Sequence, residues 1–105
     1  MSLPRHPLYD LHARMRQHIS ADLYLPVQVV KVQEEAGEIA EAWIGHMGVN
    51  PRKGRTHSLA DVRKEALDVA TTALMVHLAA GGLDSFGDLD AHIAERLARL
   101  DEVIA

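Results

Sequence analysis

The chain of 105 residues contains no cysteine, which excludes disulfides, thiolate zinc sites, iron–sulfur clusters and cysteine nucleophiles. Any metal must therefore bind through oxygen or imidazole. Only 4% of the residues are aromatic, and no segment alternates apolar and polar residues with the period of two that is typical of strands. Glycine and proline gather in a few places instead of separating many short segments. These absences predict an all-α fold.

Long apolar runs and a surplus of basic charge are also missing. No run approaches the roughly 18–20 apolar residues of a membrane span, and the first residues lack the apolar stretch of a signal peptide. We therefore expect a cytoplasmic protein with no membrane partner. The net charge of −4, from 11 basic and 15 acidic residues, argues against stable nucleic-acid binding. The composition is that of one globular domain over 1–105, in which 1–6 are expected to form a flexible tail.

Apolar residues recur with the helical period in four segments, which predicts a four-helix bundle. Pro26 is expected to open the second helix, because proline is favoured in a first turn. Ser58 is expected to cap the third helix, which should end before the glycines at 81 and 82. The expected helices cover about 8–19, 26–46, 58–80 and 85–104.

The second of these helices is apolar on more than one side. Because a helix in a small domain buries one face only, a partner copy is expected to cover the rest, and this predicts a homodimer. We expect Trp43 to pack in the core, with stacking on a nucleobase as the alternative. The main apolar stripe consists of Val32, Ala36, Ile39, Ala40, Trp43 and Met47, and Val27, Val30 and Ile44 lie off it.

Two acidic pairs with helical spacing stand on the second and third helices. Residues three apart on a helix share a face, so Glu35 points the same way as Glu38, and Glu65 the same way as Asp68. If the helices pack antiparallel, the four carboxylates converge. Thr72 continues the face of the second pair, which predicts that this face turns inward. Clustered carboxylates repel one another, and a hard cation such as Mg²⁺ relieves that repulsion. The alternative is that these acids form surface ion pairs with Lys31, Arg63 and Lys64.

Basic charge is concentrated between the two acidic motifs. The segment 46–57 contains Arg52, Lys53 and Arg55 and no acid. Long irregular segments in small domains are often functional, and phosphate groups require cations. Lys31, one turn before Glu35, is a second basic residue near the acids.

The order of these motifs resembles the all-alpha nucleoside triphosphate pyrophosphohydrolases of the MazG-type superfamily. Glu34-Glu35-x-x-Glu38 followed by Glu65-x-x-Asp68 is similar to the signature of that superfamily. The loop Asn50-Pro-Arg-Lys-Gly-Arg-Thr-His57 resembles that of a small, single-domain MazG-like subgroup. The resemblance covers residues 26–80.

The resemblance implies an enzyme that uses Mg²⁺, or Mn²⁺, to hydrolyse a nucleoside triphosphate to the monophosphate and pyrophosphate, as in house-cleaning of the nucleotide pool. By motif, Glu35, Glu38, Glu65 and Asp68 match the metal ligands, and Glu34 matches the acid that precedes them. Members assemble as dimers or tetramers. We expect Glu34, Glu35 and Glu38 to act in catalysis, with a carboxylate-oriented water attacking the α-phosphorus.

The loop and Lys31 supply the expected phosphate contacts. Lys31 and Lys53 are the first choices, followed by Arg52 and Arg55, because positive charge must stabilise the charge that develops on the phosphate oxygens.

Two other readings of the sequence remain open. A di-iron carboxylate bundle also places acids inside four helices, but it typically carries Glu-x-x-His on two of them, and this chain has none. A non-catalytic helical dimerisation or regulatory module could retain the acidic motifs without using them. His77 is expected to be a hydrogen-bonded core histidine, whereas His46 and His57 could touch substrate.

Overall fold

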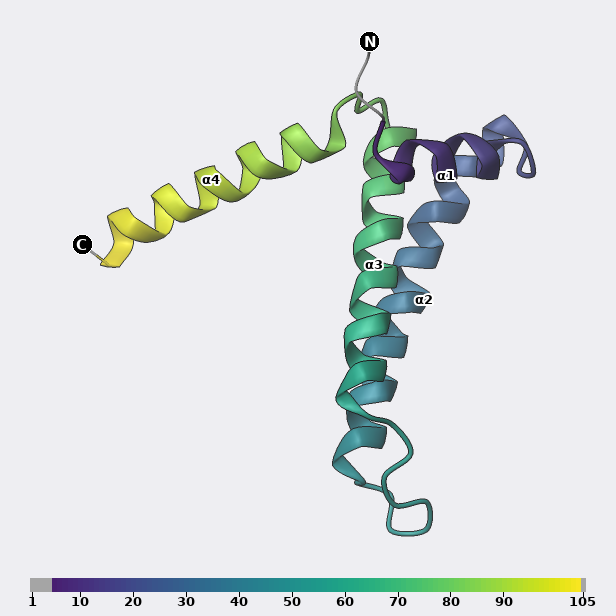
Figure 1. Ribbon diagram of the computed structural model, residues 1–105, viewed down its shortest axis with the longest axis vertical. Coiled ribbons are helices and arrows are strands. Elements are labelled where there is room, and N and C mark those ends of the chain that lie inside the picture. The colour runs from purple at the N-terminus through teal and green to yellow at the C-terminus, as the bar shows by residue number, and fades with distance from the viewer. Residues whose placement is uncertain (1–4, 105) are drawn as a thin grey trace.

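The computed structural model describes residues 5–104, and these form four helices and no strand (Figure 1). The all-α prediction is confirmed. None of the described helices combines the length and the apolar character that a membrane span requires. The helices are α1 (Pro7–Arg16), α2 (Ala21–Met47), α3 (Leu59–Ala79) and α4 (Ser85–Ile104).

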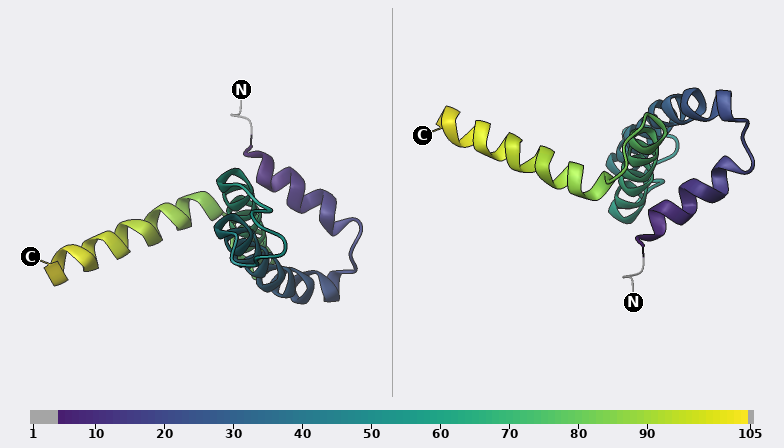
Figure 2. Two further views of the ribbon diagram at one scale, coloured as in Figure 1. Left: turned by 90° about the horizontal axis from the view of Figure 1, so that it is seen from below. Right: turned by 90° about the horizontal axis from the view of Figure 1, so that it is seen from above.

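Helices α2 and α3 form a long antiparallel hairpin, and α1 crosses its upper end (Figures 1 and 2). Tyr24 of α2 and Met75 of α3 are buried between these helices, together with Leu8 of α1. The Tyr24 hydroxyl hydrogen-bonds His12 Nδ1 of α1 at 2.7 Å and contacts Met75 Sδ at 3.9 Å. Tyr24 of α2 therefore contacts residues of both α1 and α3.

The N-terminal end of α1 is fixed by a local contact. His6 Nδ1 accepts a hydrogen bond from the Leu8 amide at 3.0 Å. The His6 ring also packs against the Phe86 ring, with 4.0 Å between the two ring centroids. Residues 1–4 of the expected tail lie outside the described residues. His6, which was expected in that tail, instead caps α1 and contacts the start of α4.

The predicted start of α2 at Pro26 is wrong, because the helix begins at Ala21 and contains Pro26. Proline removes one backbone donor, but near a helix start this forfeits a single intrahelical bond. The amides of Leu23 and Tyr24 donate to the Ser20 carbonyl and form the first turn. The contact between Tyr24 and His12 of α1 adds packing in this first part of α2 that local preference does not include.

The predicted boundaries of α3 agree closely with the structure. Ser58 and Asp61 form a capping box, in which each side chain accepts a hydrogen bond from the other residue's backbone amide. These bonds hold the pKa of Asp61 below its usual value, first through the Ser58 backbone amide. Helix α2 ends at Met47 and is capped by Gly48, whose φ of 67° is left-handed.

Helix α4 leaves the other helices at its first turn and extends away from them (Figures 1 and 2). The expected four-helix bundle is therefore not closed within residues 5–104. The radius of gyration is 17.5 Å, against about 13 Å for a compact chain of this length. The junction is held by His77, whose Nδ1 lies 2.7 Å from Ser85 Oγ and whose Nε2 lies 2.9 Å from Asp88 Oδ2. The expectation that His77 is hydrogen-bonded is confirmed, although it is only half-buried.

The apolar stripe expected to form the core of α2 is largely exposed. Trp43 is 45% exposed and Met47 46% exposed, so the expectation that Trp43 packs in the core is wrong for the described chain. Its ring instead lies 5.6 Å from that of His46. The face of α2 that turns toward α3 contains Tyr24, Gln28 and Ala42. The face of α2 that packs against α3 is therefore more polar than the apolar stripe that the sequence predicted as the core.

Candidate active site

A groove of about 350 Å³ runs between the upper parts of α1, α2 and α3, and we call it the acidic groove. It contains carboxylates from both motifs and a single basic residue, Lys31. None of its lining residues is a histidine, which disfavours the di-iron reading. The acidic groove is lined by Leu11, Met15, Gln28, Lys31, Glu34, Glu35, Glu38, Asp68, Thr71, Thr72 and Met75.

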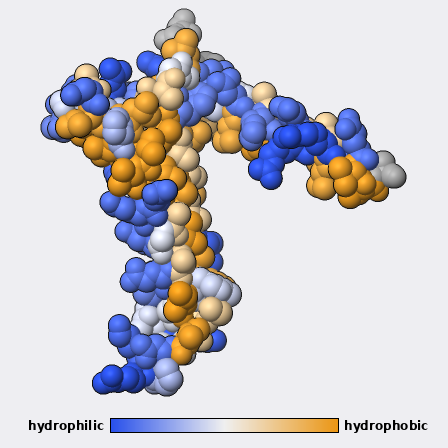
Figure 3. Space-filling view, turned by 180° about the vertical axis from the view of Figure 1, so that it is seen from behind, coloured by the Kyte–Doolittle hydropathy of each residue, from blue (hydrophilic) through white to orange (hydrophobic). Residues whose placement is uncertain are grey.

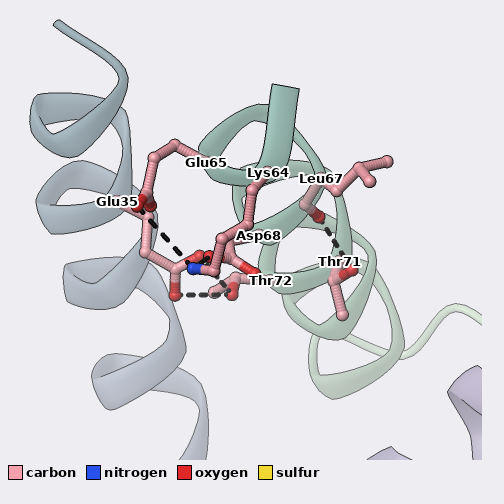
Figure 4. A network of polar contacts seen from close by, with 7 residues as sticks. All are labelled: Glu35, Lys64, Glu65, Leu67, Asp68, Thr71 and Thr72. Carbon is pink, nitrogen blue, oxygen red and sulfur yellow. Dashed lines mark hydrogen bonds and ion pairs between the residues drawn. The ribbon is translucent and has the colours of Figure 1, made fainter. Parts of the chain in front are cut away.

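Glu35 is anchored across the two helices. The hydroxyl of Thr72, which is 6% exposed, donates to the Glu35 carboxylate, with distances of 2.8 and 3.0 Å to its two oxygens. Figure 4 shows Glu35 of α2 pointing toward the side chains of α3. The face of α3 that carries Glu65 and Thr72 therefore turns toward α2, as its sequence predicted, although the Asp68 side chain is 44% exposed.

Lys64 lies beside the acids of α3. Its Nζ is 2.9 Å from Asp68 Oδ2 and 3.7 Å from Glu65 Oε1 (Figure 4). The hydrogen bond to Asp68 and the two negative charges raise the pKa of Lys64. The surface ion pairs considered from the sequence are thus present for Lys64, whose ammonium supplies positive charge next to two of the candidate metal ligands.

Glu38 and Glu65 bring carboxylates of opposite helices together. A hydrogen bond with Glu65, followed by repulsion from its charge, raises the pKa of Glu38. The Glu65 side chain is 19% exposed, and its Oε2 is buried without a hydrogen-bond partner among the described residues. A buried carboxylate oxygen without a donor is costly. The pair therefore favours a proton or a cation between the helices.

The four candidate metal ligands have the right donor atoms for a hard cation, but their side chains do not converge on one point. The donors are all carboxylate oxygens, which Mg²⁺ prefers, and the unpartnered Glu65 oxygen could accept such an ion. Within residues 5–104, however, no three carboxylates or imidazoles are gathered closely enough to form a metal cage. Metal binding at Glu35, Glu38, Glu65 and Asp68 would require their side chains to turn toward one point.

The structure separates the two groups of candidate phosphate ligands. Lys31 lines the acidic groove, whereas Lys53 lines a different pocket of about 300 Å³ at the loop end of the hairpin. Glu38 stands nine residues before the end of α2 at Met47, which is about 14 Å along the helix axis. Arg52, Lys53 and Arg55 are exposed on the loop. His57 lines the pocket of Lys53, and His46 lies outside both cavities.

Gln28 is a site residue that the sequence analysis missed. Its side chain is 0% exposed, and both amide atoms lack a hydrogen-bond partner within the described chain. A glutamine in an otherwise apolar stretch of α2 was the available signal, but helical spacing alone did not show that this position faces α3.

Comparisons with protein-family models, with curated proteins and with solved structures find no match to this chain.

Proposed function

We propose that the acidic groove is the active site of a nucleoside triphosphate pyrophosphohydrolase of the MazG-like type. The observation that carries this proposal is that carboxylates of both acidic motifs line one groove across the α2–α3 hairpin, Glu34, Glu35 and Glu38 from the first motif and Asp68 from the second. The order of the motifs in the sequence supports the same activity. The substrate is a nucleoside or deoxynucleoside triphosphate, and the products are the monophosphate and pyrophosphate.

In this proposal Glu35, Glu38, Glu65 and Asp68 hold Mg²⁺ or Mn²⁺. When bound, the cation supplies positive charge to the phosphate oxygens and neutralises the carboxylates. Thr72 fixes the orientation of Glu35 through its hydroxyl. Lys64 offsets the charge of Asp68 and Glu65 while no cation is present.

The remaining groups of the groove position and deprotonate water. Glu34 lines the groove and is the carboxylate that would orient the attacking water and accept its proton. Lys31 is placed to bind a phosphate oxygen, because it is the only lysine or arginine among the lining residues.

We also propose that the protein works as a homodimer or a higher oligomer. The apolar side of α4 is open to solvent: Ile93 is 53% exposed, Leu97 58% and Leu100 53%. Leu89 and Val103 continue the same open apolar side of the helix. Figure 3 shows apolar residues along the hairpin and in separate patches on the arm formed by α4, with hydrophilic residues between the patches. Exposed apolar surface of this kind is typical of a subunit interface.

The direct test is to incubate the protein with canonical and modified nucleoside triphosphates and Mg²⁺, and to separate the products by anion-exchange chromatography. We expect monophosphate and pyrophosphate, and we expect Glu38→Gln and Asp68→Asn to abolish turnover and weaken Mn²⁺ binding. Glu95→Gln in α4 is the matched control, since it removes one exposed carboxylate far from the groove. Release of orthophosphate and diphosphate would contradict attack at the α-phosphorus.

A second experiment separates the two sets of basic residues. Lys31→Met is expected to raise KM for the triphosphate about tenfold or more, because a charged hydrogen bond to phosphate is lost. Lys53→Met should have the smaller effect if the loop pocket does not join the groove during turnover. An equal loss in both variants would show that the loop reaches the substrate.

The non-catalytic dimerisation module predicts a different outcome. Its carboxylates need no cation, so calorimetry with Mn²⁺ and a triphosphate analogue would give no binding heat. Absence of binding together with absence of turnover would replace the enzymatic proposal with this one.

A further inference from the structure

The acidic groove has two chemically different ends. Along α2 the groove is lined by Glu35 and Glu38 toward one end and by Gln28 toward the other, with Lys31 between them, and α1 and α3 add Leu11, Met15 and Met75. Gln28 precedes Glu35 by seven residues, or about 10 Å along α2. A ligand that fills the groove must therefore carry charge at one end and an apolar body with a polar edge at the other.

The side-chain amide of Gln28 has no hydrogen-bond partner among the described residues. It is 0% exposed, and neither Nε2 nor Oε1 forms a hydrogen bond within residues 5–104. A buried amide without partners destabilises a folded chain, and such groups are rare unless water or a ligand satisfies them. The Gln28 amide is therefore available to form hydrogen bonds with a ligand, and its burial without such bonds lowers the stability of the fold.

We propose that Gln28 is a specificity-determining residue that hydrogen-bonds the edge of a nucleobase. A primary amide offers a donor and an acceptor side by side, and the pairing edges of nucleobases present the complementary acceptor and donor. Leu11 and Met75 supply apolar surface for the faces of the ring, as is common in small-molecule sites. The flexible Met15 can move to admit the ring to the covered amide.

This inference rests on the proposed function for the phosphate end of the ligand, but the base end can be tested without it. The side-chain amide signals of the protein come from Gln17, Gln28, Gln33 and Asn50, and a Gln28→Met variant identifies the pair from Gln28. Deoxynucleosides, which carry no phosphate, are titrated into the ¹⁵N-labelled parent protein without metal. We expect at least one deoxynucleoside to shift the Gln28 amide signals and leave those of Gln17 and Gln33 in place. If no deoxynucleoside shifts the Gln28 signals, the inference is wrong.

Calorimetry then compares a ligand with a base and one without. With Mg²⁺ present, Gln28→Met should weaken binding of α,β-imido deoxynucleoside triphosphates about tenfold, through the loss of a buried hydrogen bond. It should leave binding of inorganic tripolyphosphate unchanged and keep or raise the melting temperature. Gln33→Met, on an exposed position of the same helix, should change none of these quantities.

The outcomes distinguish this inference from the proposed function. If the parent protein hydrolyses triphosphates and Gln28→Met binds the imido analogues as the parent does, Gln28 does not read the base and the enzymatic proposal stands. If deoxynucleosides shift the Gln28 signals while tripolyphosphate does not bind and no triphosphate is hydrolysed, the base site stands and the enzymatic proposal is wrong.

Discussion

Helices α3 and α4 have nearly the same length, 21 and 20 residues, and opposite surroundings. α4 has the cleaner apolar stripe, yet within residues 5–104 its apolar side faces solvent, and only Ser85 at its first turn is buried. α3 carries acids on its inward face and packs along most of α2. The comparison teaches that apolar patterning predicts which surface will be covered, but not whether the same chain covers it.

The largest expected effect tests whether a second copy covers α4. Leu97→Asp should weaken dimerisation by at least about 100-fold, since burying an unpaired carboxylate in an apolar interface costs several kcal/mol. Light scattering across a dilution series measures this change. Ala98→Asp, about 100° round the helix from Leu97 and outside the apolar stripe of Leu89, Ile93, Leu97 and Leu100, should leave the dimer intact. A parent protein that is monomeric at micromolar concentration would show that no second copy covers α4.

The next effect concerns the packed helix. Thr72→Val removes the hydroxyl that donates to Glu35 across the hairpin and should lower the free energy of unfolding by about 1–2 kcal/mol. Thr71→Val is the matched control, because the Thr71 hydroxyl donates only to the Leu67 carbonyl one turn earlier on the same helix (Figure 4). Urea unfolding followed by circular dichroism gives both values. Equal losses in the two variants would mean that the Glu35 contact adds no stability between the helices.

A smaller effect is expected from the ammonium beside the acids. Lys64→Met removes a charge that lies next to Asp68 and Glu65, so Mn²⁺ no longer competes with it for these carboxylates. We expect Mn²⁺ affinity to rise about threefold, in line with the strength of an exposed ion pair. Arg63→Met, the neighbouring exposed cation, should change the affinity less. Calorimetric titration with Mn²⁺ measures these affinities. Weaker binding in Lys64→Met would mean that Lys64 helps to form the metal site instead of competing with the ion.

The smallest effect is the pH dependence of the hairpin. Glu65 raises the pKa of Glu38 above its ordinary value of 4.5 in the folded chain. The folded state therefore binds this proton more tightly than the unfolded state does, and the resulting stability is present below pH 4.5 and lost as the pH rises through the raised pKa. Between that pH and neutrality, the melting temperature of the parent should fall relative to that of Glu38→Gln. If the melting temperatures of the two proteins changed with pH in the same way, Glu65 would not raise the pKa of Glu38.

Much of the fold followed from interactions within one or two helical turns. The capping box of Ser58 and Asp61 and the glycine at position 48 set helix ends that short sequence patterns predict well. The acidic face of α3 was also predictable, because Thr72 and Met75 continue it with the same spacing. The start of α2 was not, because the contact of Tyr24 with His12 joins residues of two helices, which local preference does not include.

The sequence by itself determined four helices, most of their ends, and the two acidic pairs, each sharing one helix face. These features depend on neighbours three or four residues away. Only the tertiary structure decided that Gln28 faces inward without a partner among residues 5–104, that the Thr72 hydroxyl binds Glu35 from 37 residues away, and that Lys53 lies in a pocket apart from the acidic groove. The physical reason is that the rotation of one helix against another is set by the packing of whole faces, and local spacing carries no information about that rotation.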